Sequence, residues 1–251
     1  MVTLINIRAT LAALMLAPWL FFTSKNDFKR GLNAYRSGDY ATAAELWHSL
    51  AEEGDPKAQH NLGVMYRKGH GVPQDYAKAV KWYRRAAKQG LAAAQFNLGF
   101  MYENGHGETQ DENEEAVTWY RRAAEQGRAR AQFSLGTLYD FGCDFGDEFL
   151  LQDDDKAVIW YRRAAEQGYA PAQNGLGFMY DEGRGVPQNY VLAHMWFNLA
   201  AAQGEEMSLG SADGESGNRD IVARRMTSEQ IARAQALAAR CLASDYQDCG
   251  E

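Results

Sequence analysis

Apolar and small residues recur along most of the chain at the spacing of an amphipathic helix. Between Ala58 and Tyr66 they fall every three or four positions, which places them on one helical face. The segment RKGHGVPQD at 67–75 then supplies turn-forming glycines and a proline. Its last residue, Asp75, is suited to cap a second helix, whose apolar positions keep helical spacing as far as Ala87. The pattern predicts a helical hairpin.

This hairpin pattern occurs four times. The first helices begin with AQHNLGVMY at Ala58, AQFNLGFMY at Ala94, AQFSLGTLY at Ala131 and AQNGLGFMY at Ala172. Their starts lie 36, 37 and 41 residues apart. A period of this size is typical of stacked two-helix units, so the chain is expected to be an all-α solenoid of helix–turn–helix repeats.

The second helices also repeat. They read AVKWYRRAAKQG at 79–90, AVTWYRRAAEQG at 116–127, AVIWYRRAAEQG at 157–168 and, more loosely, AHMWFNLAAAQG at 193–204. We interpret the Trp and Tyr as buried aromatic area, the Ala pair as room for a neighbouring helix, and the Arg pair as solvated charge that suits a helix C-terminus. Each first helix also carries a glycine that would let two backbones approach, at Gly63, Gly99, Gly136 and Gly177.

Together, LGVMY, GHGVPQDY and WYRRAAKQG resemble the Sel-one-like repeat family, the bacterial relatives of tetratricopeptide repeats. The resemblance runs from Ala58 to about Gly204. It implies a right-handed α-solenoid used for protein–protein contact, in which the first helix of each repeat lines a concave face. Some cysteine-rich relatives are described as penicillin-binding or β-lactamase-like, but they carry a disulfide in each repeat, which this chain lacks.

The chain is expected to divide into eight segments. Residues 1–24 form a signal peptide or an N-terminal membrane anchor, because Arg8 precedes an apolar run of fourteen residues; a buried or cytosol-facing helix is the alternative. The others are a tetratricopeptide-like cap (25–57), repeat 1 (58–93), repeat 2 (94–130), repeat 3 with an acidic insertion (131–171), repeat 4 (172–204), a flexible acidic loop (205–220) and a capping helix with a Cys-containing tail (221–251). A capping box at 227–230 opens that last helix. The expected location is the cell envelope, periplasmic, secreted or anchored to the inner membrane.

Charge and motif content exclude several function classes. A net charge of −7 disfavours nucleic-acid binding. Neither a nucleophile motif nor a zinc-protease motif nor a phosphate loop is present, so we expect no enzyme activity, no cofactor and no metal. His70 and His106 occupy equivalent GHG turns, but repeat 4 has Arg184 there, which argues against a metal site. The acidic run 140–155 does not follow the order of a calcium loop and is interpreted as a solvated loop or a docking loop.

The three cysteines are too few for a disulfide framework. Cys241 and Cys249 stand eight residues apart across a helix end and a tail, so they are expected to form a disulfide if the compartment is oxidising. Two free thiols are the alternative. Cys143 is left without an assignment.

The best functional signal is the set of positions that vary between repeats on one face of the first helices. We expect this face to bind a protein or peptide partner, with membrane contact only through the N-terminal segment, and the protein to be monomeric. In the alternative, its phenylalanines pack between successive first helices. Two further alternatives are a binder or weak hydrolase of cell-wall fragments or penicilloyl groups, and a structural adaptor acting through the acidic loop. The candidate residues are His60, Val64, Arg67, Lys68, Phe96, Phe100, Glu103, Asn104, Phe133, Thr137, Asp140, Phe141, Asn174, Phe178, Asp181 and Glu182.

Overall fold

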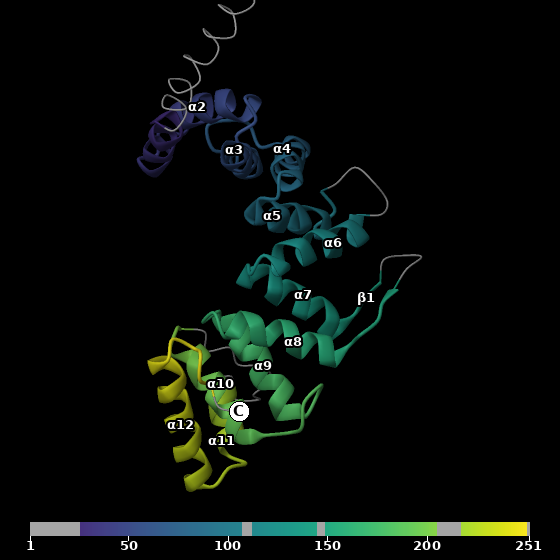
Figure 1. Cartoon of the computed structure of the whole chain (residues 1–251), viewed down its shortest axis with the longest axis vertical. Coiled ribbons are helices and arrows are strands. Elements are labelled where there is room, and N and C mark those ends of the chain that lie inside the picture. Colours follow the sequence, from purple (N-terminus) through teal and green to yellow (C-terminus); the bar gives the residue numbers. More distant parts are fainter. Residues whose placement is uncertain (1–25, 107–111, 145–148, 205–216, 250–251) are drawn as a thin grey trace, which may run out of the picture. The chain divides into compact units, whose positions relative to one another are not determined.

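The protein, seen in a computed structural model, is a succession of helices with one short β-ribbon in the part that is described (Figure 1). The structure describes residues 26–106, 112–144, 149–204 and 217–249. The predicted signal peptide or anchor and most of the predicted loop 205–220 lie outside these residues. Within them, no helix has both the length and the apolar character needed to cross a membrane. The chain forms two compact units, Met1–Glu112 and Asn113–Glu251, which are described separately.

Unit 1 contains the N-terminal cap, repeat 1 and the first helix of repeat 2. Each helix packs against the next one in the chain, and Trp47, Leu62, Met65 and Trp82 are buried in a common core. As the sequence predicted, Asp75 caps the second helix of repeat 1 by accepting a hydrogen bond from the Lys78 amide at 2.8 Å. The helices span residues 26–36, Tyr40–Glu52 (α2), Pro56–Lys68 (α3), Tyr76–Lys88 (α4) and Ala92–Glu103 (α5).

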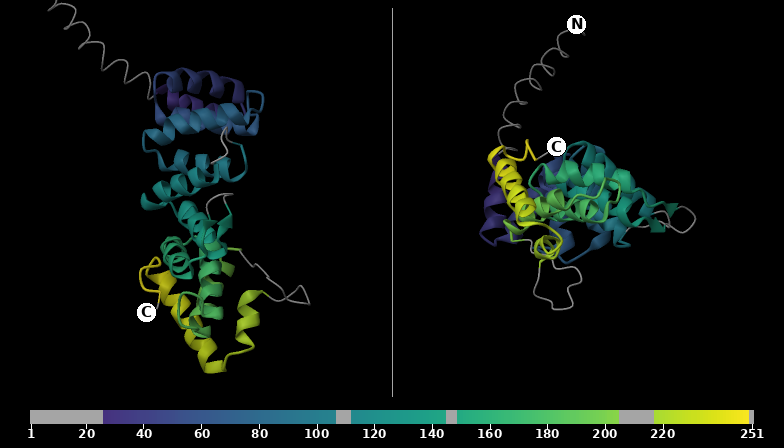
Figure 2. Two further views of the ribbon diagram at one scale, coloured as in Figure 1. Left: turned by 90° about the vertical axis from the view of Figure 1, so that its right-hand side faces the viewer. Right: turned by 90° about the horizontal axis from the view of Figure 1, so that it is seen from below.

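Unit 2 contains α6, repeats 3 and 4, and the C-terminal helices. Helix α12 runs beside α10 and packs on it (Figure 2). It begins with the predicted capping box, formed by Thr227 and Gln230. The elements are α6 (Glu112–Glu125), α7 (Ala129–Phe141), β1 (Cys143–Asp144), β2 (Phe149–Leu150), α8 (Asp154–Ala165), α9 (Ala170–Glu182), α10 (Tyr190–Ala201), α11 (Asn218–Ala223) and α12 (Ser228–Ala243).

The glycine of the first helix receives an aromatic ring of the second helix. A Cβ atom built on Gly63 would lie 2.7 Å from Cδ1 of Tyr83, a distance that real side chains do not adopt. The same overlap occurs between Gly136 and the ring of Tyr161 and between Gly177 and the ring of Phe197. The expectation that two backbones approach here is therefore corrected: the missing side chain makes room for a ring.

A buried glutamine in each first helix joins successive repeats. Its side-chain amide donates to a carbonyl oxygen in the last turn of the preceding helix, at 3.0–3.2 Å. Each of these carbonyls also accepts a backbone N–H from the turn that follows, as Ala51 does from Gly54 at 3.2 Å, so the glutamine adds a second hydrogen bond at the end of the helix. The pairs are Gln59–Ala51, Gln95–Ala87, Gln132–Ala124 and Gln173–Ala165.

The Arg pair of the second helix has two different roles. Nη2 of Arg84 donates to the hydroxyl of Tyr102 in the next first helix at 2.7 Å, and Arg162 makes the same bond to Tyr180. The second arginine instead lies over the Trp one turn before it, as Arg85 does 4.6 Å from the ring centre of Trp82. The expectation of solvated charge is therefore wrong for the first arginine, which links adjacent repeats.

Candidate binding surface

In α3, α7 and α9, side chains at the first or third of the four variable positions contact the next helical element. At the first position, Nε2 of His60 lies 2.9 Å from Nδ2 of Asn97, and the buried Asn174 accepts a hydrogen bond from Asn218. At the third position, the guanidinium of Arg67 lies 6.0 Å from the ring centre of Phe100. Asp140 and Asp181 form ion pairs with Arg184 and Arg225, at 2.6 and 2.9 Å. These side chains therefore join successive elements of the chain, and two of them, Asp140 and Asn174, are buried.

The aromatic rings of the candidate face have unequal exposure. Phe96 is buried, Phe133 packs against Tyr161 and Tyr169, and Phe178 packs edge-on against Phe197. Phe100, by contrast, is 38% exposed and Phe141 is 75% exposed. Phe96, Phe133 and Phe178 are thus packed within the protein. This agrees only in part with the alternative of packing between successive first helices, because Phe133 and Phe178 also pack on rings of second helices.

The remaining candidates divide between exposed and half-buried positions. Val64 is half-buried, and so is Thr137, whose hydroxyl donates to the Phe133 carbonyl at 3.1 Å. In unit 2, Glu182 is exposed beside Arg184, at 3.6 Å. The exposed members of unit 1 are Lys68, Phe100, Glu103 and Asn104.

The exposed end of α5 and the residue stacked on it form what we call the Phe100 surface: Arg67, Phe100, Glu103 and Asn104. Asn104 donates from Nδ2 to the carbonyl of Phe100 at 2.7 Å and so fixes the end of the helix. Burial raises the pKa of Tyr83 to about 12, and the positive charge of Arg67 acts in the opposite direction. The positive charge of Arg67 therefore acts on the buried hydroxyl of Tyr83 as well as on the exposed ring of Phe100.

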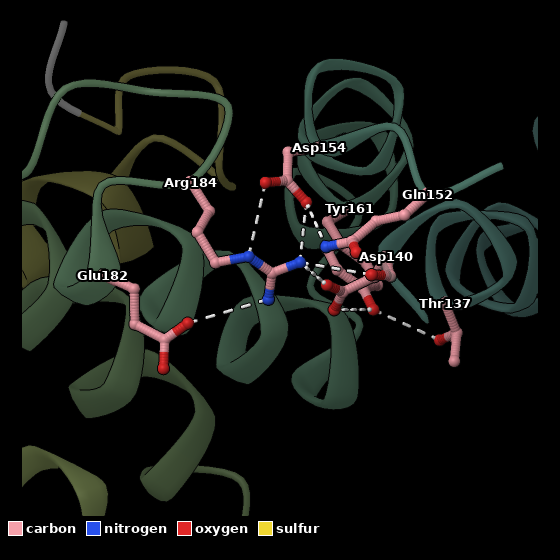
Figure 3. Close-up of polar contacts among 7 residues, drawn as sticks. All are labelled: Thr137, Asp140, Gln152, Asp154, Tyr161, Glu182 and Arg184. Carbon is pink, nitrogen blue, oxygen red and sulfur yellow. Dashed lines mark hydrogen bonds and ion pairs between the residues drawn. The ribbon is translucent and has the colours of Figure 1, made fainter. Parts of the chain in front are cut away.

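An ionic cluster in unit 2 centres on Arg184 (Figure 3). Its Nη2 atom lies 2.6 Å from a carboxylate oxygen of Asp140 and 2.6 Å from one of Asp154. The other carboxylate oxygen of Asp140 accepts a hydrogen bond from the Tyr161 hydroxyl at 3.0 Å. Hydrogen bonding from Arg184 lowers the pKa of Asp154, and burial raises the pKa of Tyr161.

The two histidines of the GHG turns stack on aromatic rings. His70 lies 4.3 Å from Tyr40 between ring centres and bonds to the Tyr35 hydroxyl at 3.0 Å; His106 lies 4.0 Å from Tyr76. Across residues 26–106, 112–144, 149–204 and 217–249, no group of His, Cys, Asp and Glu is arranged to hold a metal. The packing of both histidines thus accounts for their recurrence without a ligand role.

Cys241 of α12 and Cys249 of the C-terminal tail lie close enough for the predicted disulfide, with their Cα atoms 4.3 Å apart. The tail borders a cavity of about 280 Å³ whose wall includes Arg162, Tyr180 and Trp196. Oxidation of this pair in the mature protein stays a prediction, to be checked by alkylation without reductant.

Comparisons with known proteins agree with this architecture. The Sel1 repeat model matches residues 56–91, 92–127, 129–169 and 170–205. The crystal structure of c5321, a protective antigen of uropathogenic Escherichia coli strains displaying an SLR fold, is 32% identical with a TM-score of 0.74; the match covers 89% of this chain and 47% of that one. This chain thus spans about half the length of that protein.

A second solved structure, a Sel1 repeat protein from Oxalobacter formigenes, is also 32% identical, with a TM-score of 0.63 and coverage of 87% of this chain and 74% of that one. Among curated proteins, no relative matches. Sel1 repeat proteins generally mediate protein–protein interaction and are typically non-enzymatic. Four matched repeats over more than half of its length show that the chain belongs to the Sel1 repeat family.

Proposed function

We propose that this protein is a non-enzymatic interaction scaffold of the bacterial cell envelope that binds a peptide or partner protein through its first helices. The observation that carries the proposal is the exposure of Phe100. The rings of Phe96, Phe133 and Phe178 pack within the protein, whereas Phe100 stays 38% exposed with the cation of Arg67 against it. An exposed aromatic ring beside a fixed charge is suited to anchor a partner residue.

The chemistry of the Phe100 surface indicates the kind of contact it would make. Phe100 offers apolar area that a partner's bulky side chain would remove from water. Arg67 and Lys68 offer positive charge to a carboxylate, while Glu103 and Asn104 add acceptor groups at the end of α5. The proposed ligand is therefore an extended or helical peptide with one bulky apolar residue close to an acidic one.

An envelope location is supported by two features of the sequence. Residues 1–24 combine one early Arg with a short apolar run, as export signals and anchors do. The Cys241–Cys249 pair is of a kind retained in oxidising compartments. The segment organisation predicted from the sequence, and a monomeric state, are part of the same proposal.

The test compares three variants of the full chain. Phe100→Ala should leave thermal stability nearly unchanged, because the ring is partly solvated, and should weaken partner binding by about 1–3 kcal/mol. Phe96→Ala, one turn earlier and buried, should instead cost about 3–5 kcal/mol of folding stability. Ile159→Ala removes a comparably exposed apolar side chain from α8 and is the control for non-specific loss.

Binding is measured first by quantitative proteomics on an envelope extract and then by titration with the purified candidate. A genuine partner is retained by the wild type and by Ile159→Ala but lost from Phe100→Ala. The proposal fails if Phe100→Ala unfolds several kcal/mol more easily with no partner present, because the ring would then belong to the core. Equal retention of the partner by the wild type, Ile159→Ala and Phe100→Ala would also contradict the proposal.

A further inference from the structure

Repeat 3 carries an insertion that the other repeats lack, and the insertion forms a β-hairpin. The next repeat starts 41 residues later instead of 36 or 37. Strands β1 and β2 pair antiparallel, with Cys143 opposite Leu150 and Asp144 opposite Phe149. Figure 1 shows both strands running out from the ends of α7 and α8, away from the helices. Among the loops that the structure describes, only that of repeat 3 has such a hairpin, so packing between repeats does not explain it.

The base of this hairpin is held by a residue of repeat 4. Arg184 binds Asp140, which precedes β1, and Asp154, which follows β2 (Figure 3). The Asp153 amide donates to the Tyr139 carbonyl at 2.8 Å, which adds a backbone link across the same base. One guanidinium therefore fixes both ends of the insertion. Such fixing lowers the entropy that a loop loses on binding a partner.

Two apolar side chains at the base are left in solvent. Phe141 is 75% exposed and Leu151 is 76% exposed, the largest values among large hydrophobic residues in the described part of the chain. Since Cys143 pairs with Leu150, Phe141 and Leu151 lie at the same end of the ribbon, next to the helices. A fixed pair of exposed apolar groups is a feature that a partner can cover with a gain in apolar burial.

The surroundings of this pair are negatively charged. Asp140, Asp154 and Glu182 pair with Arg184, and Asp153 pairs with Lys156. With the exposed Asp155, and with Arg121 close to Lys156, five carboxylates stand against three cations, which leaves an excess of two negative charges. The sequence from 140 to 155 contains seven acidic residues and no Lys or Arg. The complement of this surface combines bulky apolar side chains with Lys or Arg.

We propose that the hairpin base, defined as Phe141, Leu151 and Asp155 with Arg184 holding them in place, docks a basic amphipathic segment of a partner protein. Two apolar residues of the segment cover Phe141 and Leu151, and its cations lie against Asp155 and the neighbouring carboxylates. A second copy of this chain fits poorly, because each copy carries a net charge of −7. An anionic lipid surface is repelled for the same reason. This site uses residues that the Phe100 surface does not, so neither proposal depends on the other.

The probe is a synthetic amphipathic helix of Leu and Lys, titrated into the full-length protein by fluorescence anisotropy. A helix in which Glu replaces Lys is the control for charge. We expect the Lys helix to bind, the Glu helix not to bind, and the affinity to fall as NaCl rises from about 50 to about 500 mM. The double change Phe141→Ser with Leu151→Ser should weaken binding by about tenfold or more, whereas Ile159→Ser in α8 should change it less than about twofold.

Arg184→Ala separates docking on a fixed base from simple charge attraction. Removing this cation makes the surface more negative, so attraction alone predicts tighter binding of the Lys helix. The proposal predicts weaker binding, by about threefold or more, because the base loses its fixed geometry. Both proteins are compared well below their unfolding temperatures, with helix content checked by circular dichroism.

Several results would overturn the proposal. They are unchanged affinity in the double serine variant, tighter binding in Arg184→Ala, or no binding of the Lys helix by the wild type. Dimerisation abolished by the double serine change would assign the surface to a second copy, and binding of anionic vesicles abolished by it would assign it to lipid. Phe100→Ala should leave Lys-helix binding unchanged, so this test and that of the Phe100 surface can fail separately.

Discussion

The turn after α3 in unit 1 and the turn after α9 in unit 2 have the same backbone but different side-chain chemistry. In unit 1, Gly69 and Gly71 both have φ of 71°; in unit 2, Gly183 and Gly185 have φ of 71° and 62°. The residue between the glycines is His70 in the first turn and Arg184 in the second. His70 stacks on the ring of Tyr40, whereas Arg184 pairs with carboxylates of Asp140 and Asp154.

The difference shows that backbone and side chain have separate tasks in these turns. In both, the second glycine lies against the carbonyl group of the first residue of the preceding second helix, Tyr40 or Asp154. That close approach fixes the path of the chain. The middle side chain then contacts the same first residue in whatever way its chemistry allows. The turn can therefore vary in chemistry without changing the packing of repeats.

The largest expected effect comes from blocking the shared backbone approach. Gly71→Ala and Gly185→Ala should each cost about 3 kcal/mol, because a Cβ atom would strain a positive φ and also overlap the facing carbonyl group. Gly90→Ala is the control, since φ is 89° there and nothing lies within 4 Å of the added atom, so its cost should be only about 1–2 kcal/mol. Urea unfolding measures all three. Equal losses at the three sites would mean that φ alone matters.

An effect of intermediate size on folding stability should distinguish the ion pairs of Arg184 from the ring stacking of His70. Arg184→Ala leaves Asp140 only 10% exposed and without its cation, which should destabilise unit 2 by about 2–3 kcal/mol. His70→Ala removes a stacked ring and a hydrogen bond, for about 1–2 kcal/mol in unit 1.

Salt dependence distinguishes the two losses. High salt should reduce the cost of Arg184→Ala, because it weakens the ion pairs of the wild type, and should leave the cost of His70→Ala unchanged. Hydrogen exchange read by mass spectrometry assigns each loss to its unit. The distinction between the two turns is contradicted if high salt changes the destabilisation by Arg184→Ala and by His70→Ala to the same extent.

The smallest effect is a difference in acid sensitivity. The pKa of Asp154 is lowered in the folded chain by hydrogen bonding from Arg184, so its contribution is complete above the unfolded value near 4 and is lost as pH falls below it. Capping aspartates of both units also have lowered pKa values, so the measurement compares the wild type with Asp154→Asn. The stability difference between these two proteins should be constant from about pH 7 to 5 and vanish towards pH 2. A difference that persists at pH 2 would contradict the assigned charge interaction.

Most of the fold could be predicted from the sequence because each helix carries its own signals. Apolar spacing located the hairpins, and the capping residues Asp75 and Thr227 located two helix starts. The candidate surface was harder to predict. Positions 60 and 67 share a helix face with position 64, but the structure uses them in contacts with the next element, as at His60–Asn97 and Arg67–Phe100.

The side chains that form hydrogen bonds between successive repeats were not predicted, for the same reason. Gln59 and its three equivalents belong to the Ala-Gln pair that begins each repeated first-helix motif. A polar residue that recurs beside a buried alanine indicates a buried hydrogen bond, and this signal could have been used. The role of Arg84 had no such signal, because its partner Tyr102 lies eighteen residues away in another repeat. A helical pattern specifies which residues share one face, but it does not specify what that face meets.

The sequence by itself determined the repeat, the two helices of each hairpin, their caps and the family, because these depend on interactions within a few residues or on direct repetition. Tertiary structure alone decided that Phe100, Phe141 and Leu151 stay exposed while Phe96, Asp140 and Asn174 are buried. Burial depends on how far one repeat is displaced and rotated against the next. That displacement is set jointly by the ring-on-glycine contacts, the glutamine bonds and the arginine–tyrosine bonds, and no single segment of sequence contains it.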